Sequence, residues 1–396
     1  MPAPTTARNR LDSIDALRGA VMIIMALDHL RDFIHADAFL FSPENLARTT
    51  PILFFTRWIT HFCAPVFMFS AGMSAFLVYQ RLGDKAALSR YLLKRGLWLI
   101  VLELIAVRLA FAFSLTEGLV VLEVLWALGW SMIILGGLAR LPVRTLAIFS
   151  AAVIVLHNAL DPVQGALLQS FGWMWNVLHQ PGVIPPQAPI FLLAYPLIPW
   201  FAVMSAGFCF GSVMVQDPET RQRWMVRMGA AATVAFLVLR GVNIYGNPAP
   251  WSSQSSAAMT VVSFLNVLKY PPSLDFLLMT LGPALLVLSM LDRMHWRPLN
   301  PLLVFGRVPL FYFLLHLYLI HTIAVVLAMV RYGSASFLFH PLPSMGGPAS
   351  LYPAGYGYSL WVVYLVWIGL VTALYPVCVW YWRLKSTQKS WWLRYL

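Results

Sequence analysis

The chain has 396 residues, of which 60% are hydrophobic and only 11% are charged, and its mean hydropathy is +0.73. This composition excludes a water-soluble protein, because almost every segment would have to be buried. The net charge of +12 does not indicate a nucleic-acid partner, since Lys and Arg gather in the connections on one side of the apolar runs. The three cysteines lie isolated within apolar runs and show neither a disulfide framework nor a metal-ligand spacing.

Apolar runs of about 20 residues, long enough to cross a bilayer as helices, recur along the whole chain. We expect an all-α fold: a polytopic integral membrane helix bundle with about ten transmembrane helices, eleven being the alternative, in a single domain over residues 1–396. The segment 163–179 is aromatic and apolar but short, and we expect an interfacial helix there. The expected spans are 13–34, 58–80, 90–113, 118–138, 144–160, 190–214, 225–245, 273–291, 303–330 and 357–383.

The distribution of positive charge predicts the orientation of the spans. Lys and Arg residues dominate one alternate set of connections, and this excess is typical of cytoplasmic loops. We therefore expect both termini in the cytoplasm and four long loops on the outer side. The outer set of connections holds Arg31, Arg48, Arg57, Lys269 and Arg331. The outer loops are 35–57, 161–189, 246–272 and 331–356.

The first apolar segment, IDALRGAVMIIMALDHLRDFIH, carries Asp15, Arg18, Asp28 and His29. Burying such groups in a membrane costs several kcal/mol each unless they pair or line a wet cavity, so they indicate a functional site. A purely structural alternative stays open for Asp15 and Arg18, which could simply pair one helical turn apart at the membrane edge.

Arg18 and His29 are expected on one face of this helix. Eleven residues at 1.5 Å each separate them by about 16 Å, and eleven steps of about 100° bring both side chains to nearly the same direction. Asp15 lies one turn below Arg18, toward the cytoplasm, and His29 lies toward the outer side. Asp32, one turn after His29, could fix the imidazole tautomer, as a carboxylate does for a catalytic base. The alternative is an interfacial histidine that pairs with a nearby acid.

Further polar candidates lie in other segments. His61, in the second span, is expected near the depth of His29 and ranks second among the site residues. His35, after the first helix, is a weaker candidate, because histidines are common at membrane interfaces.

The ninth span contributes three candidates. His316 is expected at mid-membrane depth, where a histidine needs a partner or water, so it is a candidate cavity residue together with Tyr312 one turn before it. A buried structural histidine is the alternative. Arg307 lies at the cytoplasmic end of this span and is a candidate anion contact.

Other chemistries find no support in the sequence, which contains no HExxH, P-loop, GxSxG or CxxC pattern. His29 and His35 are six residues apart and do not share a helix face. We therefore expect no metal site.

Four segments carry a resemblance to a known family: IDALRGAVMIIMALDH, THFCAPVFMFSAG, PWFAVMSAGFCFG and NPLLVFGRVPLFYFLLHLYLIH. They resemble the family of heparan-alpha-glucosaminide N-acetyltransferase, and in particular its bacterial members. The spacing of Arg18 and His29 also resembles the signature of the acyltransferase-3 superfamily. These resemblances imply an acyl-CoA donor reached from the cytoplasm and an acceptor, typically a sugar, on the outer side. His61 stands where the family has an aspartate, so glucosamine is not implied as the acceptor.

Together, these features predict a multi-pass acyltransferase of the bacterial inner (cytoplasmic) membrane. It would move an acyl group, acetyl in the first place, from acyl-CoA to a sugar-type hydroxyl or amine, with no metal. The expected partners are acyl-CoA, a glycan or other small acceptor, the lipid bilayer and, as an open alternative, a second copy in a homodimer. The candidate residues are His29, Asp32 and His61 for catalysis, Asp15, Arg18 and Arg307 for the donor, and Asp28, His35, Tyr312 and His316 for the substrate cavity.

The sequence leaves two other functional classes open. A transporter or flippase would use the same buried charges to bind an anionic or sugar-lipid substrate, without chemistry. A structural or assembly subunit would turn the polar face of the first helix toward a partner chain.

Overall fold

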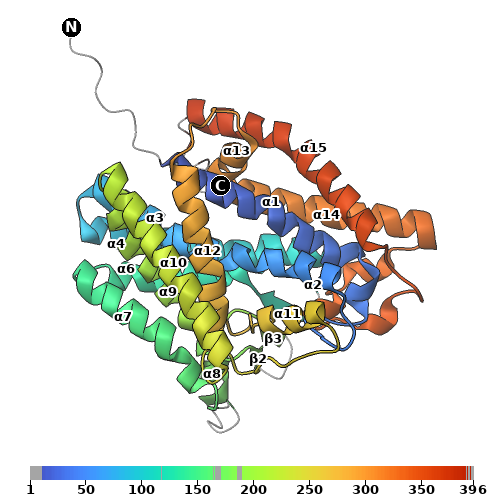
Figure 1. Cartoon of the computed structure of the whole chain (residues 1–396). Helices are drawn as coiled ribbons and strands as arrows, with labels where there is room; N and C mark the ends of the chain where they lie inside the picture. Colours follow the sequence, from blue (N-terminus) through green and yellow to red (C-terminus); the bar gives the residue numbers. More distant parts are fainter. Residues whose placement is uncertain are drawn as a thin grey trace.

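The computed structural model describes residues 11–116, 118–163, 165, 171–184, 190–388, 390 and 393. In this part of the chain the fold is a bundle of helices with a small sheet near one end (Figure 1). The helices are α1 (Asp12–Ile34), α2 (Pro51–Trp58), α3 (Cys63–Leu82), α4 (Lys85–Leu102), α5 (Arg108–Ala112), α6 (Val124–Leu138), α7 (Val143–Leu156), α8 (Gly172–Leu178), α9 (Leu197–Met214), α10 (Pro218–Val242), α11 (Ala257–Leu265), α12 (Leu274–Asp292), α13 (Pro301–Arg307), α14 (Pro309–Tyr332) and α15 (Leu360–Thr387). The strands are β1 (Leu119–Leu122), β2 (Gly182–Ile184) and β3 (Ile190–Leu193).

Seven helical stretches of the described residues are long and apolar enough to cross a membrane. α1 is not among them, because its charged side chains interrupt the apolar run, and α6 is too short. The predicted number of about ten spans and the cytoplasmic placement of both termini stay predictions. The seven stretches are Pro51–Leu82, Val143–Leu160, Leu197–Met214, Pro218–Val242, Leu274–Asp292, Pro309–Tyr332 and Leu360–Thr387.

The described residues are mostly helical, as predicted, but they also form a small sheet that an all-α fold does not include. In the described residues it has three strands in the order β1-β3-β2, with β1 parallel and β2 antiparallel to β3. β1 and β3 occupy the starts of the predicted spans 118–138 and 190–214. Both strands are runs of four apolar residues, and runs this short do not distinguish a strand from a buried helix by periodicity.

The predicted span 303–330 is two helices in the structure. Val308 separates α13 from α14 with φ −128° and ψ 46°. The residue before a proline is pushed away from helical geometry, and Pro309 follows Val308 directly. Helix α8 lies within the segment 163–179, where an interfacial helix is predicted, while residues 164 and 166–170 of that segment lie outside the described residues. Its placement at an interface stays a prediction.

Helix α1 packs against α3, α12, α13, α14 and α15. Its contact with α13 is very close, because a Cβ on Gly19 would lie 1.8 Å from the carbonyl oxygen of Leu302. A Cβ on Gly306 would likewise lie 1.7 Å from the carbonyl oxygen of Asp15. Small residues that let two backbones approach are typical of helix contacts in membranes. This contact holds Asp15 of α1 close to Arg307 of α13.

The sheet is joined to the bundle through Glu103. This residue lies in a π-helical turn over Glu103–Val107 that continues α4 into α5. Its carboxylate accepts hydrogen bonds from the backbone N–H groups of Glu123, Leu125 and Trp126, at 2.9, 3.0 and 3.3 Å. These are N–H groups at the start of α6, which have no partner within their own helix. Glu103 therefore fixes the turn between β1 and α6.

Candidate functional site: two adjoining cavities along the first helix

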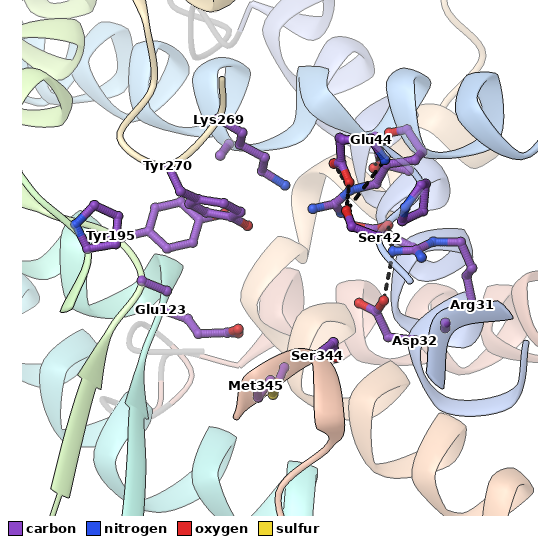
Figure 2. A pocket seen from close by; sticks show the side chains of 18 of the residues that line it. Arg31, Asp32, Ser42, Glu44, Glu123, Tyr195, Lys269, Tyr270, Ser344 and Met345 are labelled. Atoms are coloured by element: carbon purple, nitrogen blue, oxygen red, sulfur yellow. Dashed lines mark hydrogen bonds and ion pairs between the residues drawn. The ribbon is translucent and has the colours of Figure 1, made fainter. Parts of the chain in front are cut away.

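The larger cavity has a volume of about 830 Å³ and lies at the C-terminal half of α1. Its wall combines the end of α1, the start of α3 and β3 with residues of all four loops that the charge pattern assigns to the outer side. Figure 2 shows Lys269, Tyr270, Tyr195 and Glu123 on one side of this space and Glu44, Arg31 and Asp32 on the other. The loop residues that line it are 38–44, 266–270 and 343–345, together with Pro181, Asn247 and Ala249.

The smaller cavity, of about 220 Å³, lies further toward the N-terminal half of α1. It is mostly apolar, with Arg18, Ser70, Ser74 and Arg95 among its lining residues. Because Met25, Phe67 and Val124 line both cavities, the two spaces adjoin at the middle of the bundle. Helix α1 thus runs along both cavities, and Arg18 lines the smaller cavity while His29 lines the larger one.

A network of buried ion pairs forms one wall of the larger cavity. Arg31 donates to Asp28 at 3.1 Å and to Asp32 at 2.7 Å. Arg57 binds Asp28 and donates to Glu44 at 3.1 Å. Burying such charges costs free energy unless they are paired in this way. Asp32 was expected to orient His29, but its carboxylate is bound by Arg31 instead.

Glu44 is held ionised in the loop before α2. Burial, the largest single influence, raises the pKa of its carboxyl, but the Arg57 guanidinium, the nearby His61 ring and the Ser42 hydroxyl lower it and together outweigh burial. The pKa of Glu44 therefore lies well below its usual range. His61 itself is fully buried, with Nε2 3.6 Å from Glu44, and its ring packs on Phe276. His61 therefore packs between Glu44 of the cavity wall and Phe276.

His29 lies on the wall of the larger cavity and packs against an aromatic cluster. Its ring centroid is 5.3 Å from that of His316, 5.8 Å from Phe111 and 6.4 Å from Phe313. Nδ1 of His29 and Nε2 of His316 are both buried without a hydrogen-bond partner among the described residues. The other nitrogen of His316, Nδ1, lies 2.9 Å from the carbonyl oxygen of Tyr312. Since a carbonyl only accepts, Nδ1 of His316 carries a proton, and Nε2 of the neutral ring is an acceptor.

The residues predicted to line the substrate cavity separate into two groups. Asp28 lies on the wall of the larger cavity. Tyr312 and His316 are completely buried and lie behind His29 rather than at the surface. His35 ends α1, where its backbone pairs with Tyr358 and its ring is 4.0 Å from Asp37, and it is not among the lining residues. Helix geometry alone does not reveal this difference, because it depends on which neighbour covers each side chain.

The candidates for binding the donor meet at the N-terminal end of α1. Arg18 donates to the Ser70 hydroxyl at 2.9 Å, binds the Ser74 hydroxyl and lies 3.9 Å from Asp15. Arg307 binds Asp12 at 2.9 Å and lies 4.0 Å from Asp15. Arg18 faces the smaller cavity, whereas Arg307 lies over the ring of Trp382 at 5.0 Å.

A sequence profile of the family described as heparan-alpha-glucosaminide N-acetyltransferase, catalytic, matches residues 10–245. The chain belongs to this family. Membership in this acetyltransferase family makes the chain a transferase by class, and the seven helical stretches long and apolar enough to cross a membrane agree with a membrane acetyltransferase. No curated protein matches the chain. The match includes α1 with Arg18 and His29, whereas Lys269 and His316 lie outside it.

Several cavity residues of this acetyltransferase family member could not be identified from its sequence. Lys269, Tyr270, Tyr195 and Glu123 all line the larger cavity, and each comes from a loop or the end of a short strand. The signal for Glu123 was the free-energy cost of burying a carboxylate within an apolar run. The signal for Lys269 was a positive charge among the few in the connections predicted on the outer side. No group of three or more metal-ligating side chains occurs within the described ranges.

Proposed function

We propose that the chain transfers an acyl group, acetyl in the first place, from acyl-CoA to a hydroxyl or amine of a sugar-type acceptor. The donor would enter from the cytoplasmic side through the smaller cavity, and the acceptor would bind in the larger one. The observation that carries this proposal is that the two cavities adjoin along α1 and share three lining residues. The family match supports the reaction class. We place the chain in a bacterial inner membrane, as a single domain.

In this proposal, Arg18 binds the anionic or pantetheine part of the donor. Its guanidinium is already aligned by Ser70 and Asp15, so little side-chain entropy remains to be lost when the donor binds. The small volume of about 220 Å³ and the largely apolar lining of the smaller cavity suit a pantetheine arm better than a nucleotide. Arg307 and Asp15 would contribute indirectly, by holding the ends of α1 and α13 around Arg18.

His29 would act as the general base on the wall of the larger cavity. One ring nitrogen takes the proton from the acceptor hydroxyl or amine, whose oxygen or nitrogen attacks the thioester carbonyl. The carbon–sulfur bond then breaks, and the CoA thiolate leaves and takes up a proton. A hydrogen bond from Nδ1–H of His29 to Nε2 of His316 would fix the tautomer of the base, the role that Asp32 was expected to play. Asp32 and His61 would maintain the charged wall.

The test is the release of CoA from radiolabelled acetyl-CoA in the presence of a panel of sugars, with His29→Ala compared with the wild type. We expect a rate loss of about 100-fold or more, because a general base contributes on that order, with the thermal unfolding profile unchanged. His295→Ala is the matched control, since His295 is exposed in the connection between α12 and α13. A His29→Ala protein that keeps the wild-type rate would contradict the assignment of the base.

A further inference from the structure

Lys269 is a buried cation that faces the larger cavity. Only 8% of its surface is exposed, and Figure 2 shows its ammonium group pointing into the open space. The Tyr270 ring, with its centroid 5.1 Å from Nζ, is its close neighbour. Within the described part of the chain, no carboxylate lies within 4.0 Å of this ammonium group. Its charge is therefore exposed to whatever occupies the cavity.

Three carboxylates of the cavity are already engaged in ion pairs. Asp28, Asp32 and Glu44 are bound by Arg31 and Arg57. Glu123 reaches into the same space from the connection between β1 and α6 (Figure 2), but it forms no ion pair with Lys269 among the described residues. Lys269 is thus the cation of this cavity that has no fixed partner within the described residues.

The backbone around Lys269 is held in place from both sides. The side chain of Asn266 donates to the carbonyl oxygen of Glu44 at 2.9 Å, and the N–H of Leu268 donates to the side chain of Asn247 at 2.7 Å. On the other side, the N–H of Ser273 donates to the carbonyl oxygen of Leu268 at 3.0 Å. An unpaired ammonium in such a place costs free energy. A fixed position also lowers the cost of binding a ligand.

We infer that Lys269 binds an anionic group of the acceptor, a phosphate, sulfate or carboxylate attached to the sugar. This inference rests on the proposed acyl transfer and adds that the acceptor is an anionic sugar. The rings of Tyr270 and Tyr195, 5.2 Å apart and nearly perpendicular, offer an aromatic wall beside the ammonium group for the apolar face of the sugar. Glu123 is placed to accept a hydrogen bond from a hydroxyl or amine of the same ligand.

Another role for Lys269 would be to balance the surrounding carboxylates without touching a ligand. In that case its removal would affect neutral and anionic ligands equally. The two roles are therefore separated by comparing ligands that differ only in charge.

The experiment measures binding of glucose, glucose 6-phosphate, glucuronate and inorganic phosphate to the purified full-length chain in detergent. The variants are Lys269→Met and Lys269→Arg, with Arg223→Gln as the control for loss of one positive charge. Arg223 is 61% exposed at the start of α10 and pairs with Glu219. CoA binding is measured in parallel on each protein, and size-exclusion profiles confirm that each variant is folded.

We expect at least one of the two anionic sugars to bind about tenfold or more tightly than glucose, as a charge-assisted contact would allow. Lys269→Met should abolish this preference, whereas Lys269→Arg and Arg223→Gln should keep it. Equal binding of glucose and the anionic sugars, binding of none of them, or an unchanged preference in Lys269→Met would overturn the inference. Inorganic phosphate that binds as tightly as glucose 6-phosphate would overturn it as well, because the site would then recognise a free anion rather than a sugar.

The CoA measurements keep the two proposals apart. CoA should bind equally to the wild type and to Lys269→Met, since Lys269 does not line the smaller cavity. A wild-type protein that does not bind CoA would contradict the proposed acyl transfer, while the sugar measurements would still report on Lys269.

Discussion

The imidazole rings of His29 and His316 lie 5.3 Å apart between centroids, tilted by 44°. His316 is completely buried, and a bond to the carbonyl oxygen of Tyr312 fixes one of its nitrogens. The other nitrogen faces the protein interior without a hydrogen-bond partner among the described residues, as does Nδ1 of His29. Two neighbouring histidines, each with an unpartnered buried nitrogen, would satisfy one another through a single hydrogen bond.

Replacing His316 by Phe should reduce kcat about tenfold and leave the KM for acyl-CoA unchanged. The ring volume is kept, but His29 loses the group proposed to fix its tautomer, so the shape of the pH–rate profile should change as well. His321→Phe is the matched control, because His321 is equally buried in α14 and also bonds a carbonyl oxygen, that of Ala110, at 2.7 Å. Equal losses of kcat in the two variants would show that the effect is only structural.

Replacing Arg57 by Leu should destabilise the folded protein by about 3 kcal/mol or more. Asp28 and Glu44 would lose their shared cation, and a buried carboxylate without its partner is costly. Chemical denaturation in detergent measures the change. Arg48→Leu, in the loop that precedes α2, is the control, since Arg48 is exposed and should change stability by less than about 0.5 kcal/mol. Equal effects of the two substitutions would contradict the role of the ion-pair network.

Replacing Gly306 by Ala should weaken the contact between α13 and α1. The new Cβ would lie 1.7 Å from the carbonyl oxygen of Asp15, so the helices must separate, and we expect a loss of about 3 kcal/mol together with weaker CoA binding. Gly369→Ala in α15 is the control. A Cβ there meets no atom within 4 Å, so helix propensity alone predicts unchanged or slightly higher stability, by about 0.5–1 kcal/mol. A stable Gly306→Ala protein would show that the contact tolerates separation.

Much of the helical framework could be predicted from hydropathy and charge. The first predicted span, 13–34, agrees with α1 at Asp12–Ile34 to within a residue. The break at Val308 was missed, although Pro309 is visible in the sequence, because the apolar run continues through it. The strands β1 and β3 were missed because their pairing joins segments far apart in the chain.

The helical repeat predicts Arg18 and His29 on one face of the first helix, and in the structure both lie on α1, where Arg18 lines the smaller cavity and His29 the larger one. Their roles stay predictions. The residues contributed by other segments were harder to assign. Lys269 comes from a loop, and the contact of His316 with His29 depends on how α14 packs on α1. Such contacts are set by tertiary packing, for which the sequence of a single chain offers no periodic signal.

The most direct test of the account is the binding of acetyl-CoA and CoA to the purified protein, measured by calorimetry beside Arg18→Ala. We predict micromolar binding by the wild type and a loss of about tenfold or more in the variant, because Arg18 would lose its charge-assisted contact with the donor. A folded wild-type protein that binds neither compound, across several acyl chain lengths, would contradict the proposed acyl transfer. Equally tight binding by Arg18→Ala would contradict the placement of the donor in the smaller cavity.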